Sequence, residues 1–293
     1  MIEMHEDGEE HRSSMRGVVF NDVSNRLVLA DRKTQTRRPM KDLRVRLPQT
    51  VRSDPSRIRE ALSITARAGR YGARVNAHGA VTIETPQGGL GVKPGEFHFD
   101  CPLVDGETFL AQHGEGRKVW TILPRGGVQR IYVKEAWRTA EDLVDGVLFR
   151  ADDAFVRIQN TKDAAEQWVD AHANGIHGCR WRNPRFMPRW AARTYLDISL
   201  VRLMRLQDLS EGDAVAEGSQ FTDYGVDQYH RPRAGWSMGS SEHTTQCLDS
   251  ARLAFGNAWN RIHAGDNWNL KPGPDPWAQN PWVWAYTFRR VVP

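Results

Sequence analysis

The N-terminal part of the chain passes from a strand-like to a helix-like pattern of apolar residues. Residues 15–22, MRGVVFND, carry consecutive apolar side chains and predict a strand. Asn21 or Asp22 can cap a helix directly after this strand. Val23 and Leu27 then share one face, so the sequence predicts a short amphipathic helix.

The next segment, ADRKTQTRRP at positions 30–39, is dense in charge. We expect the helix to end near Arg32, which places KTQTRR on its exit. Pro39 disfavours a helical conformation at Arg38 and marks a boundary. From the residues alone, the segment fits a solvated basic turn, a phosphate clamp or part of a catalytic site.

The middle of the chain is less regular. Residues 40–127 are rich in Gly and Pro, and we interpret them as an elaboration with a short helix and a small hairpin. A strand pattern resumes at 128–137, and residues 145–153, DGVLFRADD, are expected to pair with it. Residues 155–185 predict a polar connection with a helix at 162–172.

Two further segments have the alternation of a strand. In residues 193–206, apolar Leu196, Ile198 and Leu200 alternate with more polar neighbours. Near the C-terminus, NPWVWAYTFRRV predicts a strand that begins after Pro281. Its aromatic residues, Trp282, Trp284, Tyr286 and Phe288, fall on one face. Such a face is typical of a barrel core or a covered sheet, and the alternative is a base-stacking platform.

Helical signals lie between these strands. Residues 209–218 predict a short helix, with Ser210 as its cap, Asp213 at the capping-box position and Gly218 just past its end. Residues 219–244 are expected to form a loop. The strongest helical pattern covers residues 245–265. Its expected apolar face consists of Leu248, Ala251, Phe255, Ala258 or Trp259, and Ile262.

These elements predict an α+β fold with a mostly antiparallel sheet or a small barrel. The chain has 293 residues, enough for one large domain or two modest ones. No run approaches the length of about 18 apolar residues that a membrane span requires. Residues 1–14 are polar and acidic, so we expect a disordered leader and not a signal peptide.

The net charge and the cysteine content say little about the functional class of the protein. The net charge of +4 is a weak indication of a nucleic-acid partner. Cys101, Cys179 and Cys247 are too few and too far apart for a disulfide framework, which fits the reducing cytoplasm.

Several of these blocks, taken in order, resemble a known family. RKTQTRRP, IYVKEAW, MPRWAAR, LSEGDAVAEG and NPWVWAYTFRRV resemble the ASCH superfamily, whose members are small β-barrels similar to PUA domains. The arrangement is similar to a phage and prophage branch of that superfamily, and the blocks cover about half the chain. The resemblance implies a single elaborated domain at 15–293, with insertions at about 40–127 and 219–244.

The resemblance also implies a function. The superfamily is associated with binding RNA or modified nucleotides, and one compact class hydrolyses the acetyl amide of N4-acetylcytidine. The catalytic lysine, threonine and glutamate of that class correspond by position to Lys33, Thr36 and Glu217. Asp31 stands where the motif of that class begins with glycine, and this chain is far longer, so the substrate remains open.

The chemistry of such a reaction matches these three residue types. A hydroxyl nucleophile such as Thr36 needs a nearby base, and Lys33 can act as that base if burial lowers its pKa. The Glu217 carboxylate can move protons or hold the exocyclic amine. The alternative interpretations are a solvated or phosphate-contacting turn for Lys33 and a surface position for Glu217.

Arginines supply candidate phosphate contacts. The guanidinium groups of Arg37 and Arg38 match a pair of anionic oxygens, and the alternative is plain surface charge. Residues 52–74 contain six arginines and fit either an arm that tracks a nucleic-acid backbone or a solvated helix.

Four further residues are candidates for binding a nucleotide. Arg189 and Trp190 in MPRWAAR combine a cation with a stacking surface. Glu135 and Trp137 in KEAW lie at a predicted strand end, where pocket residues often occur. The alternatives are core packing for both tryptophans and an ion pair for Glu135.

We expect no metal and no cofactor. His98 and Cys101, with His177 and Cys179, supply zinc-ligand types, but their spacing does not match a paired-cysteine site. The sequence has no phosphate-binding P-loop and no G-x-S-x-G elbow.

Together these patterns predict a cytoplasmic protein of phage type whose partner is a nucleoside, RNA or DNA, and not a membrane. The leading hypothesis is an amidohydrolase that removes an acyl group from a modified base. The alternatives are a non-catalytic reader of RNA, DNA or a modified base, a ribonuclease, and a phage protein-interaction factor.

Overall fold

The structure is a computed structural model that describes most of the chain outside the region 41–100. The described residues are 15–40, 42–43, 45–46, 66–67, 73–75, 81–85, 88–92, 98–99, 101–113, 117–141, 144–175, 180–226, 228–230, 232–238, 248–265 and 275–291. The expected leader at 1–14 and the expected helix near residue 55 lie outside them. No helix in the described part is long and apolar enough to cross a membrane.

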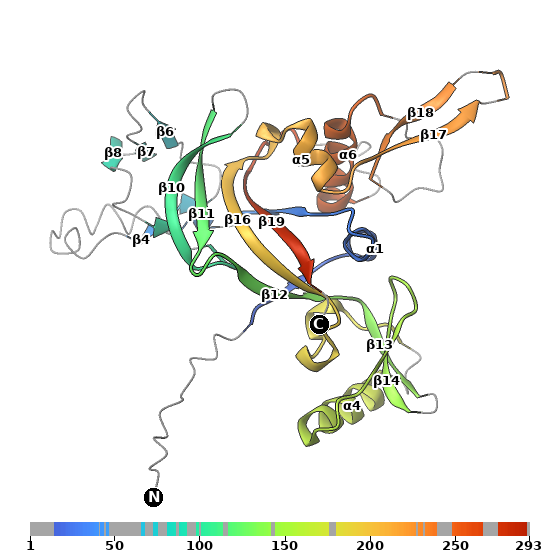
Figure 1. Cartoon of the computed structure of the whole chain (residues 1–293). Coiled ribbons are helices and arrows are strands. Elements are labelled where there is room, and N and C mark those ends of the chain that lie inside the picture. The colour runs from blue at the N-terminus through green and yellow to red at the C-terminus, as the bar shows by residue number, and fades with distance from the viewer. Residues whose placement is uncertain are drawn as a thin grey trace, which may run out of the picture.

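The described residues form an α+β fold around one seven-stranded sheet (Figure 1). Its strands are β1 (Gly17–Val19), β2 (Gln35–Pro39), β10 (Gly106–His113), β11 (Arg117–Pro124), β12 (Gln129–Lys134), β16 (Tyr195–Arg205) and β19 (Trp282–Val291). The long β16 is central: β12 and β11 pair along one side of it and β19 along the other. No pairing between described strands closes this sheet into the predicted barrel.

One edge of the sheet holds the basic segment of the sequence. Residues 35–39 are not a turn but strand β2, whose Thr36 lies opposite Tyr286 and whose Arg38 lies opposite Trp284 of β19. Helix α1 (Asp22–Leu29) precedes β2 and is capped by Asn21, whose side chain accepts from the Ser24 backbone. Because β19 is its only described partner, β2 leaves one side open for other groups.

The aromatic face of β19 lies in the core. Trp284, Tyr286 and Phe288 are almost fully buried against apolar residues of β1, β12 and β16, with Trp282 partly buried beside them. The core interpretation of this face is therefore confirmed. Burial of such large side chains is the main apolar contribution that the sheet makes to stability.

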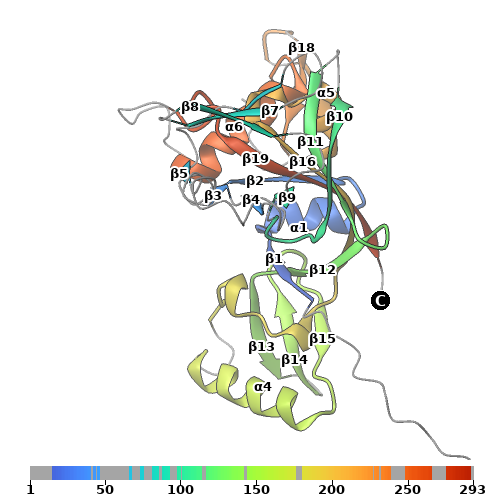
Figure 2. The ribbon, with the colours of Figure 1, turned by 90° about the vertical axis from the view of Figure 1, so that its left-hand side faces the viewer.

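Beyond β12 the chain forms a separate lobe (Figure 2). Strands β13 (Trp137–Glu141), β14 (Asp145–Phe149) and β15 (Phe155–Arg157) form a small antiparallel sheet, and helix α4 (Lys162–Asn174) packs on it. The segment DGVLFRADD therefore pairs with β13 and not with the strand of IYVK. The predicted helix at 162–172 is confirmed.

Several predicted boundaries were wrong. Residues 219–244 are not only a loop, because β17 (Gln220–Val226) and β18 (Pro232–Ser237) pair as a hairpin. Strands β10 and β11 put residues 106–124 in the main sheet, so the region 40–127 is not purely an insertion. The other described strands of the region 40–127 are β3 (Asp42–Leu43), β4 (Val45–Arg46), β5 (Ala66–Arg67), β6 (Ala73–Val75), β7 (Val81–Thr85), β8 (Gly88–Val92) and β9 (His98–Phe99).

Two helices stand beside the open edge of β2. Helix α5 (Glu211–Ala216) has the predicted capping box between Ser210 and Asp213. Helix α6 (Ala251–Ala264) begins later than predicted, at a Ser250 cap, and exposes Ile262. Helices α5 and α6 contact each other next to this edge.

Candidate functional site

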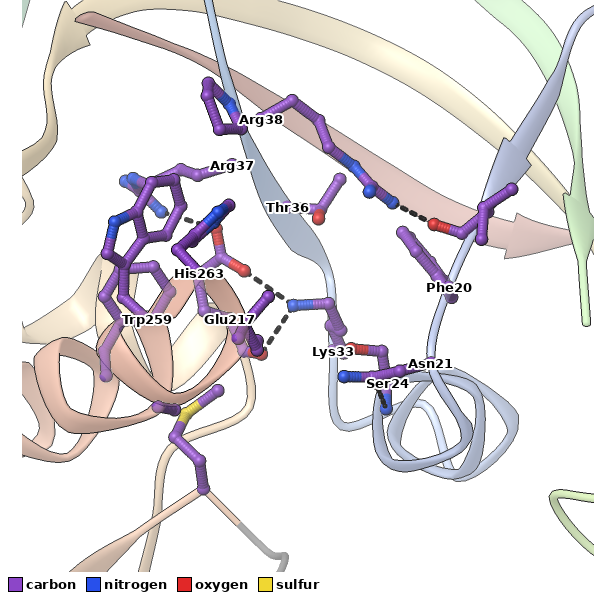
Figure 3. Close-up of a pocket in the computed structure, with 16 residues that line it drawn as sticks. Phe20, Asn21, Ser24, Lys33, Thr36, Arg37, Arg38, Glu217, Trp259 and His263 are labelled. Atoms are coloured by element: carbon purple, nitrogen blue, oxygen red, sulfur yellow. Dashed lines mark hydrogen bonds and ion pairs between the residues drawn. The ribbon is translucent and has the colours of Figure 1, made fainter. Parts of the chain in front are cut away.

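A cavity of about 250 Å³ lies between α1, β2, the end of α5, and α6 (Figure 3). Its polar wall carries Lys33, Thr36, Arg38 and Glu217. Its apolar wall comes from the end of β1 and from α6, with Phe20, Phe255, Trp259 and Ile262 among the lining residues. The three predicted catalytic residues, which are up to 184 positions apart, therefore line one cavity.

Local backbone features bring Lys33 to Glu217. Asp31 takes a left-handed conformation with φ of 54°, which ends α1 and turns the chain toward α5. The Thr34 amide then donates to the Ala216 carbonyl at 2.8 Å. Gly218 follows Glu217 with φ of 111°, and a Cβ there would lie 2.6 Å from Leu27 Cδ1. Glycine at 218 therefore meets a conformational and a steric requirement of the same junction.

Lys33 and Glu217 form a buried ion pair. Lys33 Nζ donates to Glu217 Oε2 at 2.6 Å and to the Glu217 carbonyl oxygen at 2.7 Å. Both residues are at least 95% buried. Burial lowers the pKa of the Lys33 amine, and the nearby Glu217 carboxylate offsets this only in part. The alternative of a solvated basic turn is thus wrong for Lys33.

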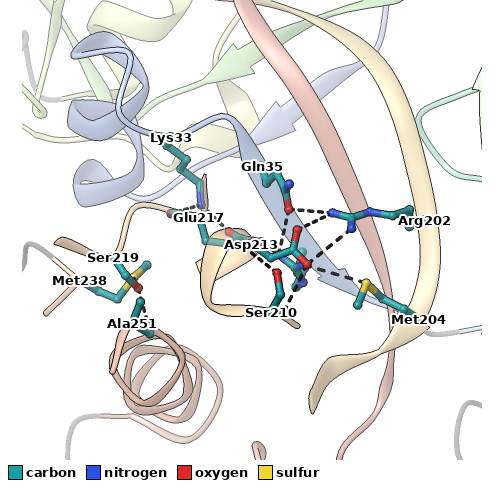
Figure 4. A network of polar contacts seen from close by, with 11 residues as sticks. Lys33, Gln35, Arg202, Met204, Ser210, Asp213, Glu217, Ser219, Met238 and Ala251 are labelled. Carbon is teal, nitrogen blue, oxygen red and sulfur yellow. Dashed lines mark hydrogen bonds and ion pairs between the residues drawn. The ribbon is translucent and has the colours of Figure 1, made fainter. Parts of the chain in front are cut away.

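Arg37 is held by two carboxylates, those of Asp213 and Glu217, which are labelled in Figure 4. Its guanidinium contacts Glu217 Oε1 at 3.0 Å and Asp213 Oδ2 at 3.2 Å, and its side chain is fully buried. Asp213 also accepts from Arg202 at 2.8 Å. Both terminal nitrogens of the Arg37 guanidinium are therefore held by carboxylates, while Arg37 also lines the cavity, and its phosphate role stays a prediction.

Asp213 links the local cap of α5 to this network. Its Oδ2 accepts from the Ser210 backbone at 3.3 Å while its carboxylate also binds Arg37 and Arg202. Burial raises the pKa of this carboxyl, but hydrogen bonds and charge from Arg202 and Arg37 outweigh that effect and hold the pKa well below its usual range.

Asp213→Asn should therefore destabilise the protein in a pH-dependent way. We expect a loss of about 2–3 kcal/mol at pH 7, since a hydrogen bond to a charged group is worth about 1.5–3 kcal/mol. Because the folded-state pKa is depressed, the advantage of the wild type is complete above the unfolded value of about 3.9 and is lost as pH falls further. Urea unfolding at several pH values measures it. A constant difference down to the lowest accessible pH would contradict this account.

Thr36 presents its hydroxyl to the cavity. The residue is 7% exposed, and no described residue forms a hydrogen bond with its side chain. Figure 3 shows the hydroxyl between Lys33 and Arg38. Buried polar groups are normally hydrogen-bonded, so a hydroxyl in a cavity wall without a protein partner is available to a ligand or substrate.

Arg38 lies at the side of the cavity next to β1. Its guanidinium lies over the Phe20 ring at 5.1 Å and donates to the Val19 carbonyl. Burial lowers its pKa, and within the described part of the chain no carboxylate forms an ion pair with it. Arg38 therefore remains a candidate for binding an anion.

Sequence reasoning missed the contribution of α6. Trp259 and His263 line the cavity, with their ring centroids 4.2 Å apart. Burial lowers the pKa of His263, which favours the neutral imidazole at pH 7. The helical pattern of residues 245–265 contained these residues, but periodicity does not distinguish a side chain in a core from one in a cavity wall.

The other predicted nucleotide contacts do not line this cavity. Glu135 is buried and paired with Arg193, with Oε2 2.6 Å from the guanidinium. Burial raises the pKa of Glu135, and Arg193 offsets part of that rise. Trp137 is 1% exposed in the core of the lobe. Arg189 is exposed and Trp190 packs partly buried against the same core.

No metal centre is found in the part of the chain that the structure describes. His177 and Cys179 lie outside it. Comparison with known proteins adds no family assignment, because no family model matches the sequence and no match was found among curated proteins or solved structures.

Proposed function

We propose that this chain is a cytoplasmic ASCH-like, PUA-related protein that hydrolyses the acyl amide of a modified nucleobase such as N4-acetylcytidine. The observation that supports this most directly is the convergence of Lys33, Thr36 and Glu217 on one cavity. A hydroxyl lies on the same cavity wall as an amine of lowered pKa that is paired with a carboxylate, and acyl transfer requires these groups.

Thr36 is the proposed nucleophile and Lys33 its base. Before the reaction, the Lys33 proton moves along the 2.6 Å contact to Glu217, which leaves a neutral amine. Burial of Lys33 favours this state, because a low-dielectric environment penalises the ammonium charge. Arg37 holds the other carboxylate oxygen at 3.0 Å and so fixes the direction of Oε2.

The proposed reaction has two steps. The Thr36 oxygen bonds to the acyl carbon, and its proton passes to the Lys33 amine. The amide C–N bond then breaks, the leaving exocyclic amine takes that proton, and the acyl group remains on Thr36 as an ester. Water cleaves the ester, which releases a carboxylic acid and restores the hydroxyl.

The apolar wall is suited to hold the base. Phe20, directly after β1, and Trp259 of α6 both offer aromatic surface to the cavity. Stacking on such rings is worth about 1–3 kcal/mol per base and tolerates different bases. The volume of about 250 Å³ is small for a ligand site and fits a base with a short acyl group.

Incubation of the purified full chain with N4-acetylcytidine tests the proposal. We expect release of cytidine and acetate, detected by chromatography, and release slowed about 100-fold to 10,000-fold in the Lys33→Met variant. Because the acyl group of the substrate is not fixed by the proposal, the same assay is run on a series of cytidines with longer N4-acyl groups. Absence of turnover on the whole series would remove the hydrolase proposal.

A second candidate is a reader that binds a modified base without chemistry. It is favoured by the resting contact, in which Glu217 already occupies the Lys33 ammonium. Calorimetry with N4-acetylcytidine separates the two candidates. Tight binding of an unchanged ligand supports the reader, whereas product formation excludes it.

A further inference from the structure

One surface segment of the lobe alternates arginine with aromatic residues. Residues 180–190 read RWRNPRFMPRW, and the segment lies beside β1 in Figure 2. Phe186 is 67% exposed, an unusual position for a large apolar side chain. Arg180, Arg185 and Arg189 are all exposed. Within the described part of the chain, no carboxylate forms an ion pair with these three arginines.

Neighbouring arginines differ from these three, because their guanidinium groups form hydrogen bonds or ion pairs within the lobe. Arg182 donates to the Ala171 carbonyl at 2.7 Å and lies over the Trp137 ring. Arg193 is paired with Glu135 and Asp152. The three exposed arginines have no comparable structural role, so their positive charge faces solvent.

The segment is held in a fixed conformation. Two short 3-10 turns, Pro184–Phe186 and Arg189–Ala191, shape it, and the Asn183 side chain caps the first. Met187, between the two turns, is 2% exposed, and Ala191, at the end of the second turn, is 0% exposed; both anchor the segment in the core of the lobe. Phe186 is therefore displayed on an ordered scaffold, which lowers the entropy lost when a partner binds.

A chain of contacts connects this segment to the cavity. Val19 lines the cavity and pairs with Lys134 across the parallel strands β1 and β12. Lys134 Nζ in turn donates to the Arg185 carbonyl at 3.1 Å. Register partners in a sheet point to the same face, so the Lys134 side chain extends from the side of the sheet that carries Val19 toward the segment.

We propose that the segment 180–189 is a binding surface for single-stranded nucleic acid that flanks the base in the cavity. Phe186 stacks on one base of the strand, and Arg180, Arg185 and Arg189 contact its phosphates. The preferred substrate is thus a base within a strand, and a free nucleoside is the minimal form that the cavity alone accepts. This inference rests on the proposed function only for the identity of the base in the cavity.

Binding of labelled strands to the full chain tests the surface. The probes are unmodified single-stranded RNA and DNA of the same sequence, about 12 nucleotides long, within known site sizes. Fluorescence anisotropy at about 50–200 mM salt gives affinity and salt slope. Phe186→Ala should weaken binding about fivefold to a hundredfold. Arg185→Ala with Arg189→Ala should reduce the slope by about 0.7 for each arginine.

Two exposed residues elsewhere serve as matched controls. Phe221 is 58% exposed on β17, and Arg125 has a side chain 74% exposed on the turn after β11. Phe221→Ala and Arg125→Ala should leave affinity and slope unchanged. Equal losses of affinity in the surface variants and in the controls would contradict the proposed surface. If polyglutamate binds as tightly as the nucleic-acid strands and with the same salt dependence, the proposal is also rejected, because the surface then fits an acidic protein partner.

The outcome is separable from that of the hydrolase proposal, because the probes carry no acyl group. If the chain binds the strands but does not hydrolyse N4-acetylcytidine, the surface proposal is supported and the hydrolase proposal is rejected. If the chain hydrolyses the free nucleoside but binds neither RNA nor DNA, the hydrolase proposal is supported and the surface proposal is rejected. Comparison of the RNA and DNA probes identifies which strand is preferred.

Discussion

Thr36→Val is expected to reduce hydrolysis of the acyl substrate by more than about a thousandfold, because it removes the nucleophilic oxygen. Valine matches threonine in shape, and the Thr36 hydroxyl has no described protein partner that its loss would leave unsatisfied. The fold should therefore survive, with an unchanged melting temperature. Substrate binding should also persist, so a fall in kcat with little change in KM is the expected pattern.

Thr36→Ser is the matched control, since it restores the hydroxyl in the same backbone position of β2. It should retain most of the activity. Lys33→Met should lose about 100-fold to 10,000-fold, as expected for a general base. Full activity in Thr36→Val would assign the nucleophile to water and leave Thr36 as a wall residue.

Glu217→Ala should destabilise the protein by about 3–5 kcal/mol, because it leaves the buried Lys33 and Arg37 without their shared partner. Glu217→Gln keeps an oxygen acceptor and should cost less. Urea unfolding at pH 7 measures both. A second substitution, Lys33→Met in the Glu217→Ala background, should recover part of the loss by removing one unpaired amine.

Glu211→Ala is the control for this series. Glu211 is exposed in the first turn of the same helix, and its carboxylate accepts one backbone hydrogen bond from Arg252 at 3.1 Å. Its removal should cost no more than about 1 kcal/mol. If Glu217→Ala costs no more than this control, the buried ion pair contributes nothing to stability.

Local signals predicted the elements around the site well. The capping box of Ser210 and Asp213, with glycine at 218, defines α5 because each of these residues acts on its own backbone neighbours. The strand β16 was also recognised by alternation. Its register shift between Ile198 and Leu200 was not, since a bulge leaves the sequence pattern locally intact while it changes the face of later residues.

The errors lie where burial is weak or the partner is distant. The hairpin β17–β18 exposes most of β17, so it has no alternation to reveal it. The carboxylate partners of Arg37 were not predicted, because they are more than 170 positions away and Asp213 already had a local explanation as a cap. The meeting of Lys33 with Glu217 followed only from the family resemblance.

The position of β2 in the sheet has a consequence for protein synthesis. β2 is translated early, but its only described partner is β19, which ends at Val291. At about 5–20 residues per second, the ribosome needs on the order of tens of seconds to deliver that partner. Until then, Thr36 and Arg38 lack their strand partners in β19. The cavity is expected to form only after β19 has been synthesised and has paired with β2, so a nascent chain that lacks residues 282–291 should be inactive.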